Sequence, residues 1–311
     1  LCHVMGREDL ETDPRYLSLK YRHQNRDSLD SAIEQWTIQM EMRETASLLH
    51  EDLRTLELGK QTDQASNLAE HFQHSKGDVK KGFEEADLVI EREFNTQTVH
   101  QGYIEPQTST ALWNEDGRLT IWTSTQGAFA IRDTSAAILG IPESLVKVVP
   151  MEIGGGFGAK ATTYLDPVVA ILSRKSGRPV KIFMSRKEVF EGTGPTSGTF
   201  VRTKIGATKA GKITAAQMYM VYEAGAFPGS PVGGGTLTGL GPYKIDNLLV
   251  DGYDVVCNKP KTQGYRAPGQ PQAAFAVEPV IDELAEKLRM DPMQLRMINA
   301  VKEGDRMPNG V

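Results

Sequence analysis

A glycine-rich segment that holds one aromatic and one basic residue is the part of this sequence best suited to chemistry. It reads Gly-Gly-Gly-Phe-Gly-Ala-Lys over residues 154–160, after an apolar stretch and before a helix-like one. Because glycine lacks a Cβ atom, four glycines in five positions let a ligand approach the backbone closely. Backbone N–H groups in such turns bind anionic groups, so the segment predicts a site for an anionic or bulky ligand.

Three interpretations of this segment compete. Lys160 follows the glycines as in a P-loop, but Ala161 stands where a P-loop carries the Ser or Thr that anchors a magnesium-bound nucleotide. Residues 154–159 also fit the dinucleotide fingerprint G-x-G-x-x-G/A, which would make the chain a dehydrogenase that binds NAD. Against that, hairpins precede the loop, and the carboxylate of Glu188 lies beyond the usual spacing of about 20 residues. The third interpretation is a glycine turn that only packs tightly.

Two further segments combine glycine or proline with a polar residue just before a helix-like stretch. Residues 123–127 read Thr-Ser-Thr-Gln-Gly, and residues 264–272 read Gly-Tyr-Arg-Ala-Pro-Gly-Gln-Pro-Gln. Each places polar groups beside a helix N-terminus, where N–H donors have no partner within the helix. Taken singly, Gln126 would cap a helix and Arg266 would form a surface ion pair. Taken together with the glycine segment, they predict three turns that converge on one large anionic cofactor.

The elements expected to position these turns mix hairpins with helices. We predict strands over residues 88–94, 111–113, 119–122, 146–153, 180–184, 200–205, 213–222 and 248–257. We predict helices over residues 128–139, 164–176 and 271–288, and one that begins at Asp291-Pro292. The stretch over residues 225–241, rich in glycine and proline, predicts an ordered irregular loop that lines a site. The fold class is therefore α+β, with mixed sheets, hairpins and packed helices.

Composition excludes several classes of function. The chain has 311 residues and a formal net charge of −5, which gives no electrostatic reason to bind nucleic acid. We find no apolar run of about 18 residues and no signal pattern, so we expect no membrane span and a cytoplasmic location. The two cysteines cannot hold an iron–sulfur cluster. The chain begins at Leu1, and we expect it to be a piece of a longer protein.

Six segments occur in an order that is typical of one protein family. They are residues 98–106, 122–126, 154–160, 265–269, 278–285 and the pair Asp291-Pro292. In this order they resemble the large, molybdenum-binding subunit of the xanthine dehydrogenase / aldehyde oxidase family. The resemblance covers about residues 48–311 and leaves residues 1–47 unassigned. It implies that residues 48–85 are the tail of a hammerhead-like domain with its linker, and that residues 86–311 are the first half of a molybdenum-cofactor-binding domain.

The resemblance also implies roles for particular residues. Gln126 matches the glutamine that hydrogen-bonds an oxo ligand of molybdenum, Phe157 the aromatic that borders the substrate, and Arg266 the arginine of the third cofactor loop. Molybdenum would be held through the pterin, with no direct protein ligand. The full set implied to bind the cofactor is Gln126, Gly127, Gly155, Gly156, Phe157, Gly158, Arg266 and Ala267.

The family chemistry implied is hydroxylation of an aldehyde, an N-heterocycle or an aromatic substrate with oxygen from water. Electrons would pass to iron–sulfur clusters and FAD on partner subunits. The resemblance allows a cytosine dinucleotide form of the molybdopterin cofactor and a dimer of heterotrimers.

Departures from the family pattern limit what the segment is expected to do. The Gly-x-Gly-Glu segment that carries the family's catalytic base is not among these residues, so we expect this segment alone to be inactive. Ala161 stands where purine-oxidising members carry a glutamate, and Ala267 where members that oxidise carbon monoxide carry a cysteine. A non-catalytic subunit that only assembles with partners remains an alternative, beside the NAD-binding dehydrogenase.

Overall fold

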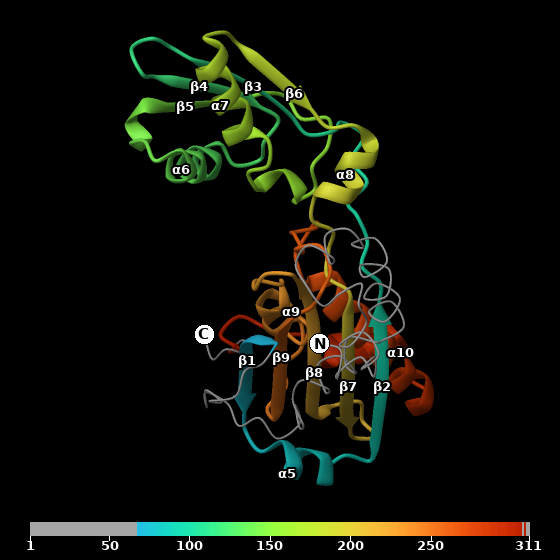
Figure 1. Ribbon diagram of the computed structural model, residues 1–311. Helices are drawn as coiled ribbons and strands as arrows, with labels where there is room; N and C mark the ends of the chain where they lie inside the picture. The colour runs from blue at the N-terminus through green and yellow to red at the C-terminus, as the bar shows by residue number, and fades with distance from the viewer. Residues whose placement is uncertain (1–66, 307, 309–311) are drawn as a thin grey trace, which may run out of the picture.

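The structure, a computed structural model, describes residues 67–306 and residue 308 of the chain. These residues form two lobes, each built on one β-sheet (Figure 1). The five-stranded lobe comprises residues 67–96 and 199–306, and the four-stranded lobe comprises residues 108–192. The chain therefore passes between the lobes twice, along connecting segments at residues 97–107 and 193–198.

The five-stranded lobe carries helices on its mixed sheet. Its strands are β1 (Leu68–Lys76), β2 (Leu88–Thr96), β7 (Thr199–Ala207), β8 (Ile213–Gly225) and β9 (Leu248–Val256). Its helices are α5 (Val79–Glu84), α9 (Val232–Thr238), α10 (Gln270–Leu288) and α11 (Pro292–Asn299). The sheet order is β1-β9-β8-β7-β2, in which β8 and β9 run parallel and the other neighbours antiparallel. The helix α10 packs on β2 and β7, while α9 packs on β9, β8 and β1.

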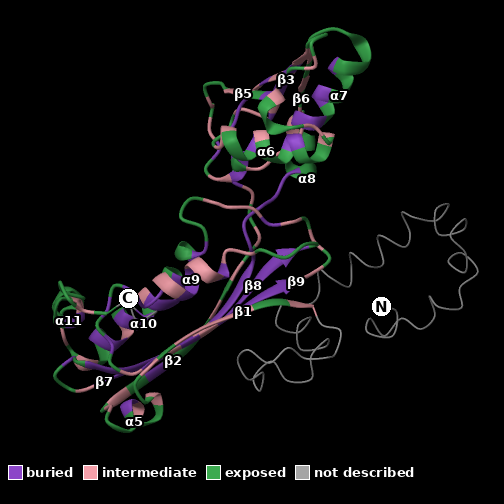
Figure 2. Cartoon of the chain, turned by 90° about the vertical axis from the view of Figure 1, so that its left-hand side faces the viewer, coloured by how far each residue is buried: buried purple, intermediate pink, exposed green. Residues whose placement is uncertain are grey.

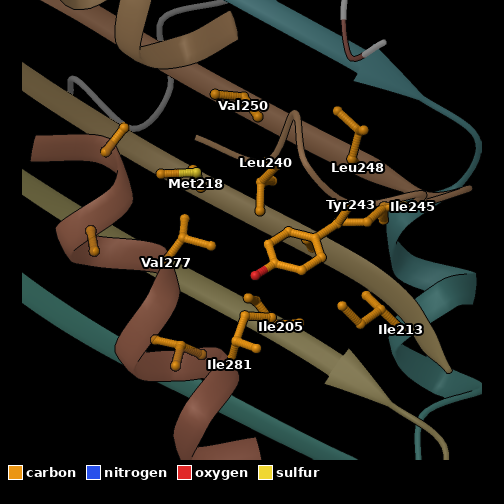
Figure 3. Close-up of a cluster of buried hydrophobic side chains, with 14 of the residues drawn as sticks. Ile205, Ile213, Met218, Leu240, Tyr243, Ile245, Leu248, Val250, Val277 and Ile281 are labelled. Atoms are coloured by element: carbon orange, nitrogen blue, oxygen red, sulfur yellow. The ribbon is translucent and has the colours of Figure 1, made fainter. Parts of the chain in front are cut away.

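A hydrophobic core joins this sheet to α10 (Figure 3). On β8, Met218 and Met220 belong to this core, whereas Val221 packs in a separate cluster on the opposite face, as strand alternation requires. Helix α10 contributes Val277 and Ile281, four residues apart and so on one face of the helix. Figure 2 shows β8 and β9 buried along most of their length. This lobe therefore supplies a rigid base for the loop that precedes α10.

The four-stranded lobe is smaller and has three helices, of which α6 and α7 pack on its sheet. Its strands are β3 (Thr108–Trp113), β4 (Leu119–Thr123), β5 (Val146–Pro150) and β6 (Val180–Phe183). Its helices are α6 (Ala128–Leu139), α7 (Asp166–Ser176) and α8 (Arg186–Gly192). The sheet order is β5-β4-β3-β6, and only β4 and β5 run parallel. Helix α6 packs on β5 and α7 on β3, and the buried side chains Ile121, Val146 and Val169 lie in their common core.

The predicted helix ends are confirmed where the sequence carries a strong signal. Helix α6 has the predicted bounds and ends at Gly140, whose φ of 66° is left-handed, and α7 ends in the same way at Gly177 with φ of 64°. Asp291 caps α11, because its carboxylate accepts the N–H of Gln294. None of the helices in the described part of the chain is long and apolar enough to cross a membrane. The α+β fold class is confirmed.

The prediction of an irregular loop over residues 225–241 is wrong for its central part. Residues Val232–Thr238 form α9, although the sequence Val-Gly-Gly-Gly-Thr-Leu-Thr contains three successive glycines that disfavour a helix. A Cβ atom on Gly235 would lie 2.8 Å from the Tyr222 hydroxyl and 3.0 Å from the Gly269 carbonyl oxygen. Close packing between β8 and the start of α10 therefore requires glycine here and holds the helix in place.

Strand β1 and helix α5 lie within residues 48–85, the stretch predicted to be the tail of a preceding domain and a linker. The strand β1 pairs with β9 in antiparallel register, with His71 opposite Tyr253, and forms one edge of the sheet. The boundary at residue 86 stays a prediction. The unassigned residues 1–47 lie outside the part of the chain that the structure describes.

Candidate functional site

The three segments singled out in the sequence form loops at the junction of the two lobes. Gln126 and Gly127 lie between β4 and α6, and the glycines of residues 151–158 follow β5, so both loops belong to the four-stranded lobe. Arg266 and Ala267 precede α10 and belong to the five-stranded lobe. Hydrogen bonds join each loop to the next, so the structure brings all of these residues together.

The Gln126 side chain is fixed through its oxygen and leaves its amide nitrogen free. Its Oε1 atom accepts the backbone N–H of Gly158 at 2.9 Å and that of Lys160 at 3.3 Å. The backbone N–H of Gln126 donates to the Lys160 carbonyl oxygen at 2.9 Å. Only an oxygen can accept two N–H groups, so the carboxamide orientation is set, and Nε2 has no partner among the described residues. Gln126 is exposed and so presents a hydrogen-bond donor at the junction.

Two glycines of the second loop are required by close approach of its neighbours. A Cβ atom on Gly156 would lie 2.7 Å from Oε1 of Gln126. A Cβ atom on Gly158 would lie 2.4 Å from the Gly264 carbonyl oxygen, and Gly158 also has φ of 108°, which favours glycine. Gly158 is thus the point where the second loop touches the third, and a side chain there would push the two lobes' loops apart.

Two residues of the site hold a left-handed backbone without being glycine. They are Phe157, with φ of 52°, and Ala267, with φ of 58°. Such a conformation costs about 1–2 kcal/mol per residue and is found preferentially at ligand sites. The backbone N–H of Arg266 donates to the Phe157 carbonyl oxygen at 2.8 Å, and this hydrogen bond links the two loops that hold the left-handed residues. The Phe157 side chain is 46% exposed and offers an aromatic surface on the glycine loop.

Several hydrogen-bond donors at the junction have no partner within the described part of the chain. The Arg266 side chain is exposed, and no hydrogen bond or ion pair to its guanidinium group is found among the described residues, so the surface ion pair considered for it is not formed there. Helix α6 follows Gly127, which has no side chain to cap the N–H groups of the first helical turn. Unpartnered N–H groups and a guanidinium group favour an anionic ligand.

An ion pair with a buried lysine lies behind the glycine loop. The Lys160 side chain is fully buried, and its Nζ lies 2.6 Å from Oε2 of Glu105 and 2.8 Å from Oγ of Ser124. The same Oε2 atom accepts the Ser124 hydroxyl at 2.8 Å and the Gly154 N–H at 2.8 Å. The ammonium also lies 5.1 Å from the centre of the Tyr103 ring. Lysine, carboxylate and hydroxyl therefore form one closed network beneath the loop.

The environment of this network shifts the pKa values of both charged groups. Burial alone would raise the pKa of Glu105, but hydrogen bonds from Lys160, Ser124 and Gly154 outweigh burial and hold that pKa below its ordinary value. Burial lowers the pKa of Lys160, while the neighbouring Glu105 carboxylate acts in the opposite direction. The Glu105 carboxylate is therefore suited to accepting hydrogen bonds and poorly suited to removing a proton from a substrate.

The geometry disfavours both nucleotide-binding interpretations of the glycine loop. Lys160 points inward to Glu105, so its ammonium cannot reach a phosphate on the outer side of the loop as a P-loop lysine does. In the dinucleotide fold the glycines lead directly into a helix whose N-terminus binds the pyrophosphate. Here a 3-10 turn at Ala159–Ala161 follows instead, and α7 begins only at Asp166.

Comparison with known protein families identifies the family to which this chain belongs. The model of the molybdopterin cofactor-binding domain matches residues 60–300. The chain belongs to this family. It is 32% identical over 237 residues to the nicotinate dehydrogenase large molybdopterin subunit of Eubacterium barkeri, covering 75% of this chain and 56% of that protein. It is 30% identical over 249 residues to the xanthine dehydrogenase molybdenum-binding subunit of Escherichia coli O157:H7, covering 78% of this chain and 33% of that protein.

Solved structures show the same molybdopterin-binding fold. The aldehyde oxidoreductase from Desulfovibrio gigas matches with a TM-score of 0.74 and 29% identity, over 79% of this chain and 28% of that one. The quinoline 2-oxidoreductase from Pseudomonas putida 86 matches with a TM-score of 0.72 and 27% identity, over 78% of this chain and 32% of that one. The chain thus spans about a third of the length of these structures, and the relatives it matches are molybdenum-dependent oxidoreductases.

Sequence reasoning missed the residues that support the three loops. Glu105 and Ser124 lie in segments that the sequence analysis names, but no role was predicted for either residue. Lys160 was considered only as a phosphate-binding lysine. One signal was present, because Lys160 is a charged residue within an otherwise apolar and glycine-rich run. Its partner could not be found from the sequence, since Glu105 lies 55 residues away on the first connecting segment.

Proposed function

We propose that this chain forms part of the large subunit of a molybdenum hydroxylase and that its three loops hold a molybdopterin-type cofactor. The observation that carries the proposal is the Gln126 carboxamide, held by Oε1 so that Nε2 is free to donate at the point where the loops meet. The residues present fit such a group, because the junction offers unpartnered donors and closely packed glycines to an anionic ligand.

Four of the predicted site residues have a defined task in this proposal. When bound, the molybdenum cofactor supplies activation of water and takes up the electrons that leave the substrate. Gln126 donates a hydrogen bond from Nε2 to an oxygen atom of the cofactor, and Arg266 balances negative charge with its guanidinium group. Gly127, at the uncapped start of α6, leaves backbone N–H donors free for the same purpose. The exposed ring of Phe157 orients a planar substrate by stacking.

Substrate and partners follow from the same assignment. An aldehyde, an N-heterocycle or an aromatic compound is the proposed substrate, and the relatives named for nicotinate, quinoline and aldehyde oxidation support these classes. Iron–sulfur and FAD partner subunits carry the electrons away, and the relatives named as a large molybdopterin subunit and as a molybdenum-binding subunit support a chain that works with partners. A cytosine dinucleotide form of the cofactor, a dimer of heterotrimers and a cytoplasmic location belong to the same proposal.

The test uses the full-length subunit purified with its partner subunits. An aldehyde and N-heterocycle panel is assayed with an artificial electron acceptor in water labelled with oxygen-18. We expect turnover of at least one class, with the label in the product. Gln126→Glu keeps the Oε1 acceptor but removes the donor, so kcat should fall about 100-fold. The control Gln294→Glu changes an exposed glutamine on α11 and should leave kcat unchanged.

Two results would contradict the proposal. Full activity of Gln126→Glu would contradict the role of the Gln126 carboxamide as a hydrogen-bond donor. Molybdenum bound in stoichiometric amount without turnover of any substrate class would favour the alternative of a non-catalytic subunit that serves assembly.

A further inference from the structure

The Glu105–Lys160 ion pair contacts both ends of the glycine loop. At the start of the loop, Glu105 makes two hydrogen bonds to Gly154: its Oε2 accepts the Gly154 N–H at 2.8 Å, and its own N–H donates to the Gly154 carbonyl at 3.1 Å. At the end of the loop, Lys160 is itself the last residue, and its Nζ reaches back to Glu105 at 2.6 Å. The ion pair therefore closes the seven-residue segment into a ring.

The backbone of Lys160 also fixes the loop that carries Gln126. The Lys160 carbonyl oxygen accepts the Gln126 N–H at 2.9 Å and the Thr125 hydroxyl at 3.0 Å. The Lys160 N–H donates to Oε1 of Gln126 at 3.3 Å. In addition, Ser124 bridges the two charged groups from the same loop. Any movement of Lys160 is thus passed on to the Gln126 carboxamide through direct hydrogen bonds.

Stability alone does not account for a charged pair in this position. The Lys160 side chain is fully buried, whereas that of Glu105 is 32% exposed. Removing the lysine charge from water costs several kcal/mol, and replacing a buried ion pair by apolar residues is often neutral or stabilising. The Lys160 ammonium nevertheless has an acceptor for each of its three protons, since Nζ lies 2.6 Å from Oε2 of Glu105, 2.8 Å from Oγ of Ser124 and 3.5 Å from the Pro106 carbonyl oxygen. A satisfied polar network of this kind specifies one geometry of the groups attached to it.

We infer that the Glu105–Lys160 ion pair is a positioning element that sets the direction in which the Gln126 Nε2 group donates. The inference rests on the proposed function, because it assigns a purpose to the direction of that donor. Neither charged residue touches the ligand in this arrangement. They act through the glycine loop and through the backbone of Lys160.

A double-mutant cycle in the full-length subunit with its partners tests this inference. The four proteins are the wild type, Lys160→Met, Gln126→Ala and the double variant, with kcat expressed per bound molybdenum. Lys160→Met should lower kcat at least tenfold with KM changed less than twofold. In the Gln126→Ala background the same change should lower kcat less than twofold, because the group it positions is gone.

A matched control separates positioning from general destabilisation. Lys259→Met breaks a different ion pair, in which Nζ of Lys259 lies 2.5 Å from Oε1 of the buried Glu223 carboxylate. It should leave kcat per molybdenum unchanged. Hydrogen exchange of the peptide that spans residues 153–161 gives a second readout, which does not depend on activity. Exchange there should rise at least tenfold in Lys160→Met and stay unchanged in Lys259→Met.

The outcomes distinguish failure of the ion-pair role from failure of the proposed function. Equal loss of kcat from Lys160→Met in both backgrounds, or no loss at all, would overturn the positioning role. If Lys160→Met does not retain molybdenum, Ser124→Ala takes its place in the cycle, with an expected loss of about threefold that also disappears without Gln126. Unchanged exchange in the loop of Lys160→Met would count against the inference as well. Absence of molybdenum from the wild type would instead overturn the proposed function.

Discussion

Replacement of Gly158 by alanine should separate the two loops that meet at this residue. The added Cβ atom would lie 2.4 Å from the Gly264 carbonyl oxygen and 2.7 Å from its carbonyl carbon. Both atoms belong to the backbone, so no side-chain rotation can relieve the contact. The loops therefore move apart, and the hydrogen bonds from Gly158 to Gln126 and from Arg266 to Phe157 are lost with the contact.

The loss in free energy of unfolding caused by Gly158→Ala can be compared with the loss caused by the same change at a glycine with no atoms close to an added Cβ. Gly158 has φ of 108°, and an alanine at such a φ costs about 1–2 kcal/mol. Two lost hydrogen bonds add about 1 kcal/mol each, which gives about 3–4 kcal/mol in total. Gly140 provides the matched control, since its φ is 66° and nothing lies within 4 Å of an added Cβ atom. Gly140→Ala should therefore cost only about 1–2 kcal/mol.

The assay compares both variants in the full-length subunit. Urea unfolding gives the free energy of unfolding, and metal analysis gives the bound molybdenum. We expect Gly158→Ala to lose about 2 kcal/mol more than Gly140→Ala and to retain less than a tenth of the wild-type molybdenum. Gly140→Ala should retain all of it. Equal stability and full molybdenum in Gly158→Ala would refute the reasoning that the two loops must touch at this glycine.

Two further predictions concern stability. The pKa of Glu105 is lower in the fold than its ordinary value of 4.5, so the stabilising effect of its carboxylate is present above that value and is lost as pH falls through the lower, folded pKa. The difference in free energy of unfolding between wild type and Glu105→Gln should therefore shrink as pH falls below 4.5, and a difference that does not change with pH would speak against the assigned hydrogen bonds. Ala267→Gly should raise the free energy of unfolding by about 0.5–1 kcal/mol, because it relieves the left-handed backbone at φ of 58°, and a decrease in calorimetry would contradict the strain.

Local signals in the sequence predicted most of the elements in the described part of the chain. Periodic apolar residues and the glycines after α6 and α7 gave the helix ends, since a left-handed C-cap is a property of a few neighbouring residues. Helix α9 was missed because its three glycines disfavour a helix locally, and packing around Gly235 decides its conformation. Tertiary contacts of that kind leave no periodic pattern in the sequence.

The candidate site likewise contains residues that local sequence patterns predicted and residues that only the fold brings together. The three loops were found because glycine, proline and a polar residue stand before helices, which is a local pattern. The Glu105–Lys160 pair was not found, because its two residues meet only when the first connecting segment lies beneath the glycine loop. The direction of the Gln126 donor likewise depends on which backbone groups reach Oε1, and that is set by the fold.

Bound molybdenum in the full-length subunit is the most direct measure of the central claim. The subunit is produced with its partner subunits in cells that make the molybdenum cofactor, and metal and pterin are measured on the purified complex. The three converging loops predict about one molybdenum and one pterin per subunit, in a ratio that stays constant through further purification. A purified, folded wild-type complex without molybdenum would contradict the account.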